Sequence, residues 1–82
     1  MIKILRVHNV DKFALSVEFS DGLEGLFDGD ALLSRTGPLL DPLRKSDYFA
    51  RAFVDAGSLC WPNGLELSAK RVREQCRMLQ TN

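Results

Sequence analysis

The chain has 82 residues, 45% hydrophobic and 27% charged, which is the composition of one small globular domain, expected to span residues 1–82. Eleven basic and eleven acidic residues give a formal net charge of zero, which argues against a general binder of nucleic acids or anionic membranes. No apolar run reaches membrane-spanning length and residues 1–3 show no signal-peptide pattern, so we expect a cytoplasmic protein with no membrane partner.

The N-terminal part of the chain is rich in residues that favour strands. Residues 2–10 predict a first strand, although its alternation is imperfect. Alternation is clearest in residues 13–19, where one set of alternate side chains is apolar and predicts a buried face. Residues 20–22 have a hairpin signature, and residues 23–27 return as an antiparallel strand. Within that strand, Gly25 indicates a bulge or close packing.

The middle of the chain predicts short helices. Asp28 or Asp30 is expected to cap a helix over residues 31–35, and this is favoured over a calcium site because the full calcium-loop pattern is missing. Residues 39–44 predict a loop or a single helical turn, and residues 46–49 predict another short turn whose aromatic side chains lean on the core.

A second hairpin leads into the most distinctive turn of the chain. Residues 51–55 and 58–61 predict two strands joined at Ala56-Gly57. Pro62 fixes its own φ and Asn63-Gly64 tolerates positive φ, so the chain turns here. Trp61 is interpreted as an anchor in the core or at its rim, with a binding platform as the alternative. Trp61 and Asn63 are therefore candidate interaction residues.

The last segment predicts a helix that begins after Ser68, a good N-cap. Val72, Cys76 and Leu79 fall on one face at helical spacing. The remaining surface carries a group of basic candidate residues, Lys70, Arg71, Arg73 and Arg77. This pattern favours a solvated terminal helix, and the alternative is a helix that contacts nucleic acid.

The sequence contains little that indicates catalysis or cofactor binding. Cys60 and Cys76 are far apart and lack a CxxC spacing, so we expect reduced, buried thiols and neither a zinc site nor a disulfide. His8 is interpreted as a partly buried strand residue, because no nucleophile or acid lies near it in the sequence. Nucleotide-binding loops and hydrolase motifs are missing, and we expect no enzyme activity and no cofactor.

Four segments carry a recognisable succession of apolar, acidic and turn residues. They are Leu15-Ser16-Val17-Glu18-Phe19-Ser20-Asp21-Gly22, Leu26-Phe27-Asp28 with Leu32-Leu33, Phe53-Val54-Asp55, and Trp61-Pro62-Asn63-Gly64 with Leu65-Glu66-Leu67. In this succession the chain resembles the small bacterial family known as domain of unknown function 2442. The Trp-Pro-Asn-Gly element is the most specific part. Two departures are Glu66, where the family commonly has aspartate, and Val72-Arg73, where it usually has Leu-Tyr.

The resemblance implies a small α+β fold and gives no catalytic residues to carry over. Members are often encoded beside another small uncharacterised protein, and the two are proposed to act as toxin and antitoxin. Some relatives carry an added DNA-binding domain, for which 82 residues leave no room.

Together, these patterns predict an α+β fold with an antiparallel sheet of about four or five strands, short helices, and a C-terminal helix packed on the sheet. We expect a non-enzymatic protein-interaction module, antitoxin-like, whose partner is another small protein. A homodimer is expected because residues 13–19 or the first strand would leave an exposed sheet edge. The alternative is a nucleic-acid-binding regulator that uses the basic helix.

Overall fold

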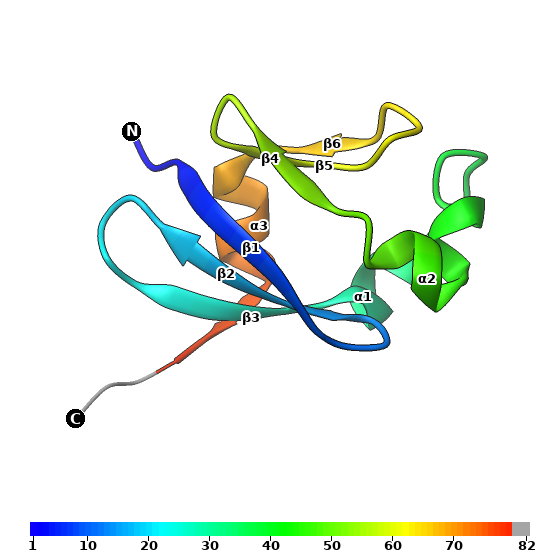
Figure 1. Ribbon diagram of the computed structural model, residues 1–82, viewed down its shortest axis with the longest axis horizontal. Coiled ribbons are helices and arrows are strands. Elements are labelled where there is room, and N and C mark those ends of the chain that lie inside the picture. The colour runs from blue at the N-terminus through cyan, green and yellow to red at the C-terminus, as the bar shows by residue number, and fades with distance from the viewer. Residues whose placement is uncertain (80–82) are drawn as a thin grey trace.

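The computed structural model describes residues 1–79, so residues 80–82 of the predicted domain lie outside the described part. The predicted α+β class, with antiparallel strands, short helices and a C-terminal helix, is confirmed (Figure 1). In chain order the elements are β1 (Ile4–Asp11), β2 (Ala14–Phe19), β3 (Glu24–Asp28), α1 (Gly29–Leu33), η1 (Asp41–Arg44), α2 (Ser46–Phe49), β4 (Phe53–Asp55), β5 (Ser58–Cys60), β6 (Glu66–Leu67), α3 (Ala69–Gln75) and β7 (Cys76–Met78).

The strands of residues 1–79 are divided between two sheets, which the sequence did not predict. The four-stranded sheet has the order β1-β2-β3-β7, and the three-stranded sheet has the order β4-β5-β6; neighbouring strands are antiparallel in both. The predicted alternation of residues 13–19 is confirmed, because Leu15, Val17 and Phe19 are buried on one face of β2. The expectation that this strand is an exposed edge is wrong, since a hairpin at each end pairs it with β1 and β3.

One edge of the four-stranded sheet is β1, the other strand expected at an edge, and it carries two irregularities. Leu5 and Val10 are extra residues relative to β2, and each is 53% exposed. At its start β1 lies beside the second sheet, where the Ile4 amide donates a 2.9 Å hydrogen bond to the carbonyl of Gly57. His8 is exposed opposite Ser16, so the expectation of partial burial is wrong. Its neighbour Val7 packs on the core opposite Val17, and the alternation of the strand places the His8 side chain on the other face.

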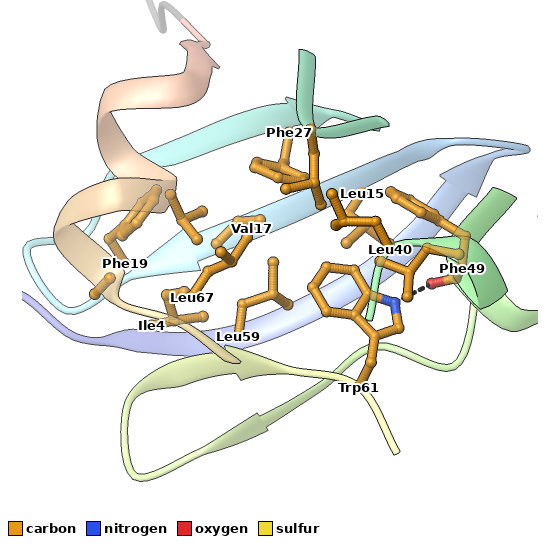
Figure 2. Close-up of a cluster of buried hydrophobic side chains, with 14 residues drawn as sticks. Ile4, Leu15, Val17, Phe19, Phe27, Leu40, Phe49, Leu59, Trp61 and Leu67 are labelled. Carbon is orange, nitrogen blue, oxygen red and sulfur yellow. Dashed lines mark hydrogen bonds between the residues drawn. The ribbon is translucent and has the colours of Figure 1, made fainter. Parts of the chain in front are cut away.

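The core lies between the two sheets and is closed at its ends by helices. Trp61 is 1% exposed at its centre, and its indole Nε1 donates a 3.0 Å hydrogen bond to the carbonyl of Phe49 (Figure 2). The rings of Trp61 and Phe49 are 5.7 Å apart between centroids, and Phe13 meets Phe49 edge-on at 5.6 Å. One cluster of buried side chains therefore joins both sheets and the short helices.

The short helices follow from capping and proline. Asp28 accepts a 2.9 Å hydrogen bond from the Asp30 amide, which confirms Asp28 as the cap, although α1 begins at Gly29, two residues before the predicted start. The helical alternative for residues 39–44 is confirmed by η1, which has Pro42 in its first turn. Residues 46–49 form one turn of helix, α2, which buries Phe49 as predicted.

The C-terminal helix is shorter than predicted. Ser68 caps α3 as expected, accepting a 3.2 Å hydrogen bond from the Arg71 amide, and α3 packs against β3 and β5. The predicted continuation to Leu79 is wrong, because residues 76–78 form β7 and pair with β3. Gly25 makes this pairing possible, since a Cβ on it would lie 2.9 Å from the Cβ of Cys76. Close packing is therefore the reason for this glycine.

The turn after Trp61 requires glycine. Gly64 has φ of 94°, and no atom lies within 4 Å of where its Cβ would be, so a side chain there meets backbone strain and no clash. We expect Gly64→Val to destabilise the fold by about 1–3 kcal/mol, measured by urea unfolding. Gly64→Asn is the matched control and should cost less, because asparagine tolerates positive φ better. Equal midpoints for wild type and Gly64→Val would contradict the strain argument.

Candidate functional site

The two candidate residues from the turn, Trp61 and Asn63, both form hydrogen bonds within the fold. Trp61 is buried and its side chain packs in the core, whereas Asn63 is half-buried. Asn63 donates a 2.8 Å hydrogen bond from Nδ2 to the carbonyl of Leu39 and accepts one of 3.2 Å from the Leu65 amide. It thereby ties the turn to the loop before η1.

The four basic candidate residues do not form one surface patch on a helix. Lys70 and Arg71 are exposed on α3, whereas Arg77 lies on β7, opposite Leu26 of β3. Arg73 is committed to the fold: its guanidinium lies 4.8 Å from the centroid of the Phe19 ring and forms an ion pair with Asp21 at 2.9 Å. The predicted cluster is therefore divided, because the helix ends at Gln75.

The contact of Arg73 with Asp21 ties α3 to the turn between β2 and β3. Two hydrogen bonds, of 2.9 and 3.3 Å, join the guanidinium to the two carboxylate oxygens. The side-chain hydrogen bond from Arg73 lowers the pKa of Asp21 below its usual 3.8. The ion pair therefore stabilises the folded state fully at pH values above the usual pKa of Asp21. This stabilisation is lost as the pH falls through the lowered pKa of the folded state.

The outer face of the three-stranded sheet gathers a different set of side chains. Phe53, Cys60 and Glu66 lie in one row across β4, β5 and β6, because Phe53 is opposite Cys60 and Cys60 is opposite Glu66. Asp55 and Ser58 form the next row on the same face. The opposite face of these strands carries Val54, Leu59 and Leu67, which pack on the core.

This outer face contains a surface hollow of about 310 Å³, which we name the Phe53 hollow. Phe53 is 43% exposed at its wall, although aromatic side chains of this size are usually covered. The hollow is lined by Phe53, Asp55, Cys60, Trp61, Pro62, Gly64, Leu65 and Glu66. Most of the Trp-Pro-Asn-Gly element and the residues after it therefore form one side of it.

The electrostatics of the Phe53 hollow are acidic. Its charged residues are Asp55 and Glu66, and neither carboxylate forms an ion pair within residues 1–79. The Cys60 Sγ lies 3.7 Å from Glu66 Oε2. Burial raises the pKa of the Cys60 thiol, and the carboxylates of Glu66 and Asp55 raise it further. The carboxylates of Glu66 and Asp55 therefore both affect the same thiol, that of Cys60.

A larger hollow of about 540 Å³, the N-terminal hollow, lies elsewhere on the surface. It is formed by residues 1–3, the turn between β4 and β5, and the start of α3, and its charged side chains are Lys3 and Lys70. The two hollows therefore have opposite charge.

Phe53, Asp55 and Glu66 were not among the candidate interaction residues chosen from the sequence. The predicted hairpin already placed Phe53 and Asp55 on the same face as Ser58 and Cys60, which was a usable signal. Glu66 had no such signal, because β6 has only two residues and was not predicted.

The two cysteines are free thiols; Cys60 is buried, as expected, whereas Cys76 is only half-buried. Burial raises the pKa of Cys76 to about 11, and the pKa of Cys60 is also raised, so both are protonated at neutral pH. We expect Cys60 to react slowly with a thiol reagent at pH 7 until the chain is unfolded in urea. Cys76→Ser isolates Cys60, and Cys60→Ser is the matched control. Rapid labelling of folded Cys76→Ser protein would contradict the expectation.

Residues 1–79 contain neither a metal-binding cluster nor a membrane-spanning helix. No group of three or more His, Cys, Asp and Glu side chains in this range is arranged to hold a metal ion. No helix in the same range is long and apolar enough to cross a membrane.

Comparison with known proteins places the chain in a family. No curated protein and no solved structure matches the chain. Residues 4–77 match the family described as Protein of unknown function (DUF2442), a range that contains every strand residue but Met78 and the whole lining of the Phe53 hollow. The chain therefore belongs to the DUF2442 family.

Proposed function

We propose that this protein is a non-enzymatic module that binds another polypeptide in the cytoplasm, as the antitoxin-like partner of a small protein. The observation that carries the proposal is the exposed Phe53 on the uncovered outer face of the three-stranded sheet. An exposed aromatic side chain beside a shallow hollow is typical of protein interfaces, which favour aromatic anchors surrounded by polar groups.

The chemistry of the Phe53 hollow favours binding over catalysis. Its one thiol, that of Cys60, is buried and has a raised pKa, which keeps it in the unreactive protonated form. The neighbouring carboxylates Glu66 and Asp55 are negative charges that disfavour a thiolate further. A surface that recognises a partner through shape and charge needs neither a nucleophile nor a base.

The nucleic-acid alternative has less support because α3 ends at Gln75 and is shorter than predicted. Lys70 and Arg71 are the exposed basic residues on α3, while Arg73 is held by Asp21 and Arg77 lies on β7. Two adjacent lysine or arginine residues neutralise few phosphates, so binding would be weak and steeply salt-dependent. A sequence-selective complex with DNA or RNA at physiological salt would place this alternative first.

The test is affinity purification of the tagged full-length chain from its native cell, followed by mass spectrometry. We expect one small protein in stoichiometric amount, with its recovery lost in Phe53→Ser. Leu39→Ser is the matched control, since Leu39 is 46% exposed and does not line the Phe53 hollow. Light scattering over a wide concentration range tests the expected homodimer in the same preparations. A strict monomer with no recovered partner would contradict the proposed function.

A further inference from the structure

The Phe53 hollow combines one apolar wall with two carboxylates. Phe53 offers exposed aromatic surface, and Pro62 and Leu65 add apolar surface from the turn. Asp55 and Glu66 are the charged groups of the hollow. A ligand that covers this surface must therefore bury apolar area. It must also either keep the two carboxylates in contact with solvent or neutralise their charge.

The shape of the turn leaves room for a main chain to approach. No atom lies within 4 Å of the position that a Gly64 Cβ would occupy, so the backbone of the turn is open on this side. Cys60 forms the floor between Phe53 and Glu66, and it is 7% exposed. The accessible part of the hollow is therefore wide and shallow, which suits an extended or helical polypeptide segment better than a small enclosed ligand.

The negative charge of the Phe53 hollow distinguishes among the molecules that could bind there. A second copy presenting the same face would bring Asp55 and Glu66 of each chain close to those of the other, and like charges at an interface disfavour association. A nucleic acid would bring phosphates against the same carboxylates. A segment with lysine or arginine complements them, and arginine matches a carboxylate with two parallel hydrogen bonds.

We infer that the outer face of the three-stranded sheet binds a polypeptide segment in which a lysine or arginine lies beside an apolar side chain. The apolar side chain covers Phe53, and the basic side chain reaches Glu66 or Asp55. This inference rests on the proposed function and names the chemistry of its partner.

The inference can be tested with a library of random twelve-residue peptides displayed on phage and selected on the intact protein. Enriched peptides are expected to contain lysine or arginine within two residues of an aromatic or aliphatic residue. Synthetic copies labelled with fluorescein are then measured by anisotropy. We expect affinity to fall about tenfold in the double variant Asp55→Asn/Glu66→Gln, the size of two modest charge contacts, and to fall with added salt.

Matched variants show whether the loss of peptide affinity is specific to the Phe53 hollow. Glu24→Gln/Glu74→Gln removes the same formal charge from exposed residues outside the Phe53 hollow and should leave affinity unchanged. Phe53→Ser should weaken binding while the fluorescence of buried Trp61 reports an intact fold. Peptide binding that survives both Asp55→Asn/Glu66→Gln and Phe53→Ser overturns the inference.

Other outcomes separate the inference from the proposed function. Enrichment of acidic peptides whose binding is lost in Lys3→Glu/Lys70→Glu would assign recognition to the N-terminal hollow, leaving the proposed function intact and overturning the inference. Failure to enrich any basic and apolar motif also overturns the inference, whatever affinity purification recovers. The proposed function fails separately, when no partner is recovered and the protein remains a monomer.

Discussion

Replacing Trp61 with alanine is expected to destabilise the protein by about 3–5 kcal/mol, the range for removing a buried large aromatic side chain. Trp61 is 1% exposed and lies where both sheets and the α2 helix meet, so its removal leaves a cavity that these elements cannot easily close (Figure 2). Because small domains have net stabilities of about 5–15 kcal/mol, this loss is a large share of the total. Urea unfolding followed by circular dichroism measures it.

Trp61→Phe separates the indole hydrogen bond from the bulk of the ring. The carbonyl of Phe49 accepts from Trp61 Nε1 at 3.0 Å and also from the Ala52 amide at 3.3 Å, so it keeps a partner in the phenylalanine variant. We therefore expect a smaller loss than for alanine, with about 1 kcal/mol due to the hydrogen bond. A loss below 1 kcal/mol for Trp61→Ala would show that this residue is not the centre of the core.

Adding a single methyl group at Gly29 is expected to have the second large effect. A Cβ there would lie 2.6 Å from Cε2 and 2.7 Å from Cζ of Phe49, and 3.0 Å from the carbonyl oxygen of Phe13. The carbonyl cannot move away without losing its 2.7 Å hydrogen bond from the Gly29 amide. Gly29→Ala should therefore destabilise the fold by about 1–3 kcal/mol, the usual cost of overpacking, measured by urea unfolding.

A double-mutant cycle identifies the source of this effect. Phe49→Leu shortens the side chain that the new methyl group would meet, at the cost of lost core packing. If the clash with Phe49 dominates, Gly29→Ala should cost less in the Phe49→Leu background than in the wild type. Strictly additive losses would instead assign the cost to the contact with the backbone of Phe13.

Local patterns allowed part of the fold to be predicted. The strand over residues 13–19 alternates between apolar and small or polar side chains, and that period of two is present in the sequence itself. The turn at Pro62-Asn63-Gly64 and the cap at Ser68 depend on the conformational preferences of single residues, and both are present. Such features need no information from distant parts of the chain.

The C-terminal segment was mispredicted because its conformation is set by a distant partner. Helical spacing is present in Val72, Cys76 and Leu79. Residues 76–78 nevertheless form a strand, because they hydrogen-bond to β3 and cover its edge. Leu79 is consequently 46% exposed and does not extend the apolar row. The hydrogen bonds that β3 offers, and the space left by Gly25, have no trace in the local sequence around Cys76.

The Phe53 hollow could not be predicted from the sequence for a related reason. Trp61 and the basic residues were candidates because of their residue types. Burial, which the sequence does not show directly, decides what a side chain can contact. The Phe53 hollow depends on three strands lying side by side, and its third strand, β6, is too short to show a period. The predicted turn supplies one part of the lining of the hollow, from Trp61 to Glu66, whereas Phe53 and Asp55 come from β4.

The pairing of β3 with β7 has a consequence for synthesis of the chain. Gly25 of β3 pairs with Met78, so the four-stranded sheet needs a segment that is translated after its other three strands. Until residues 76–78 have left the ribosome, the nascent chain carries an uncovered edge on β3, and open edges of this kind invite pairing with other chains. The interval between translation of β3 and translation of β7 is therefore the time during which this edge is open to pairing with another chain.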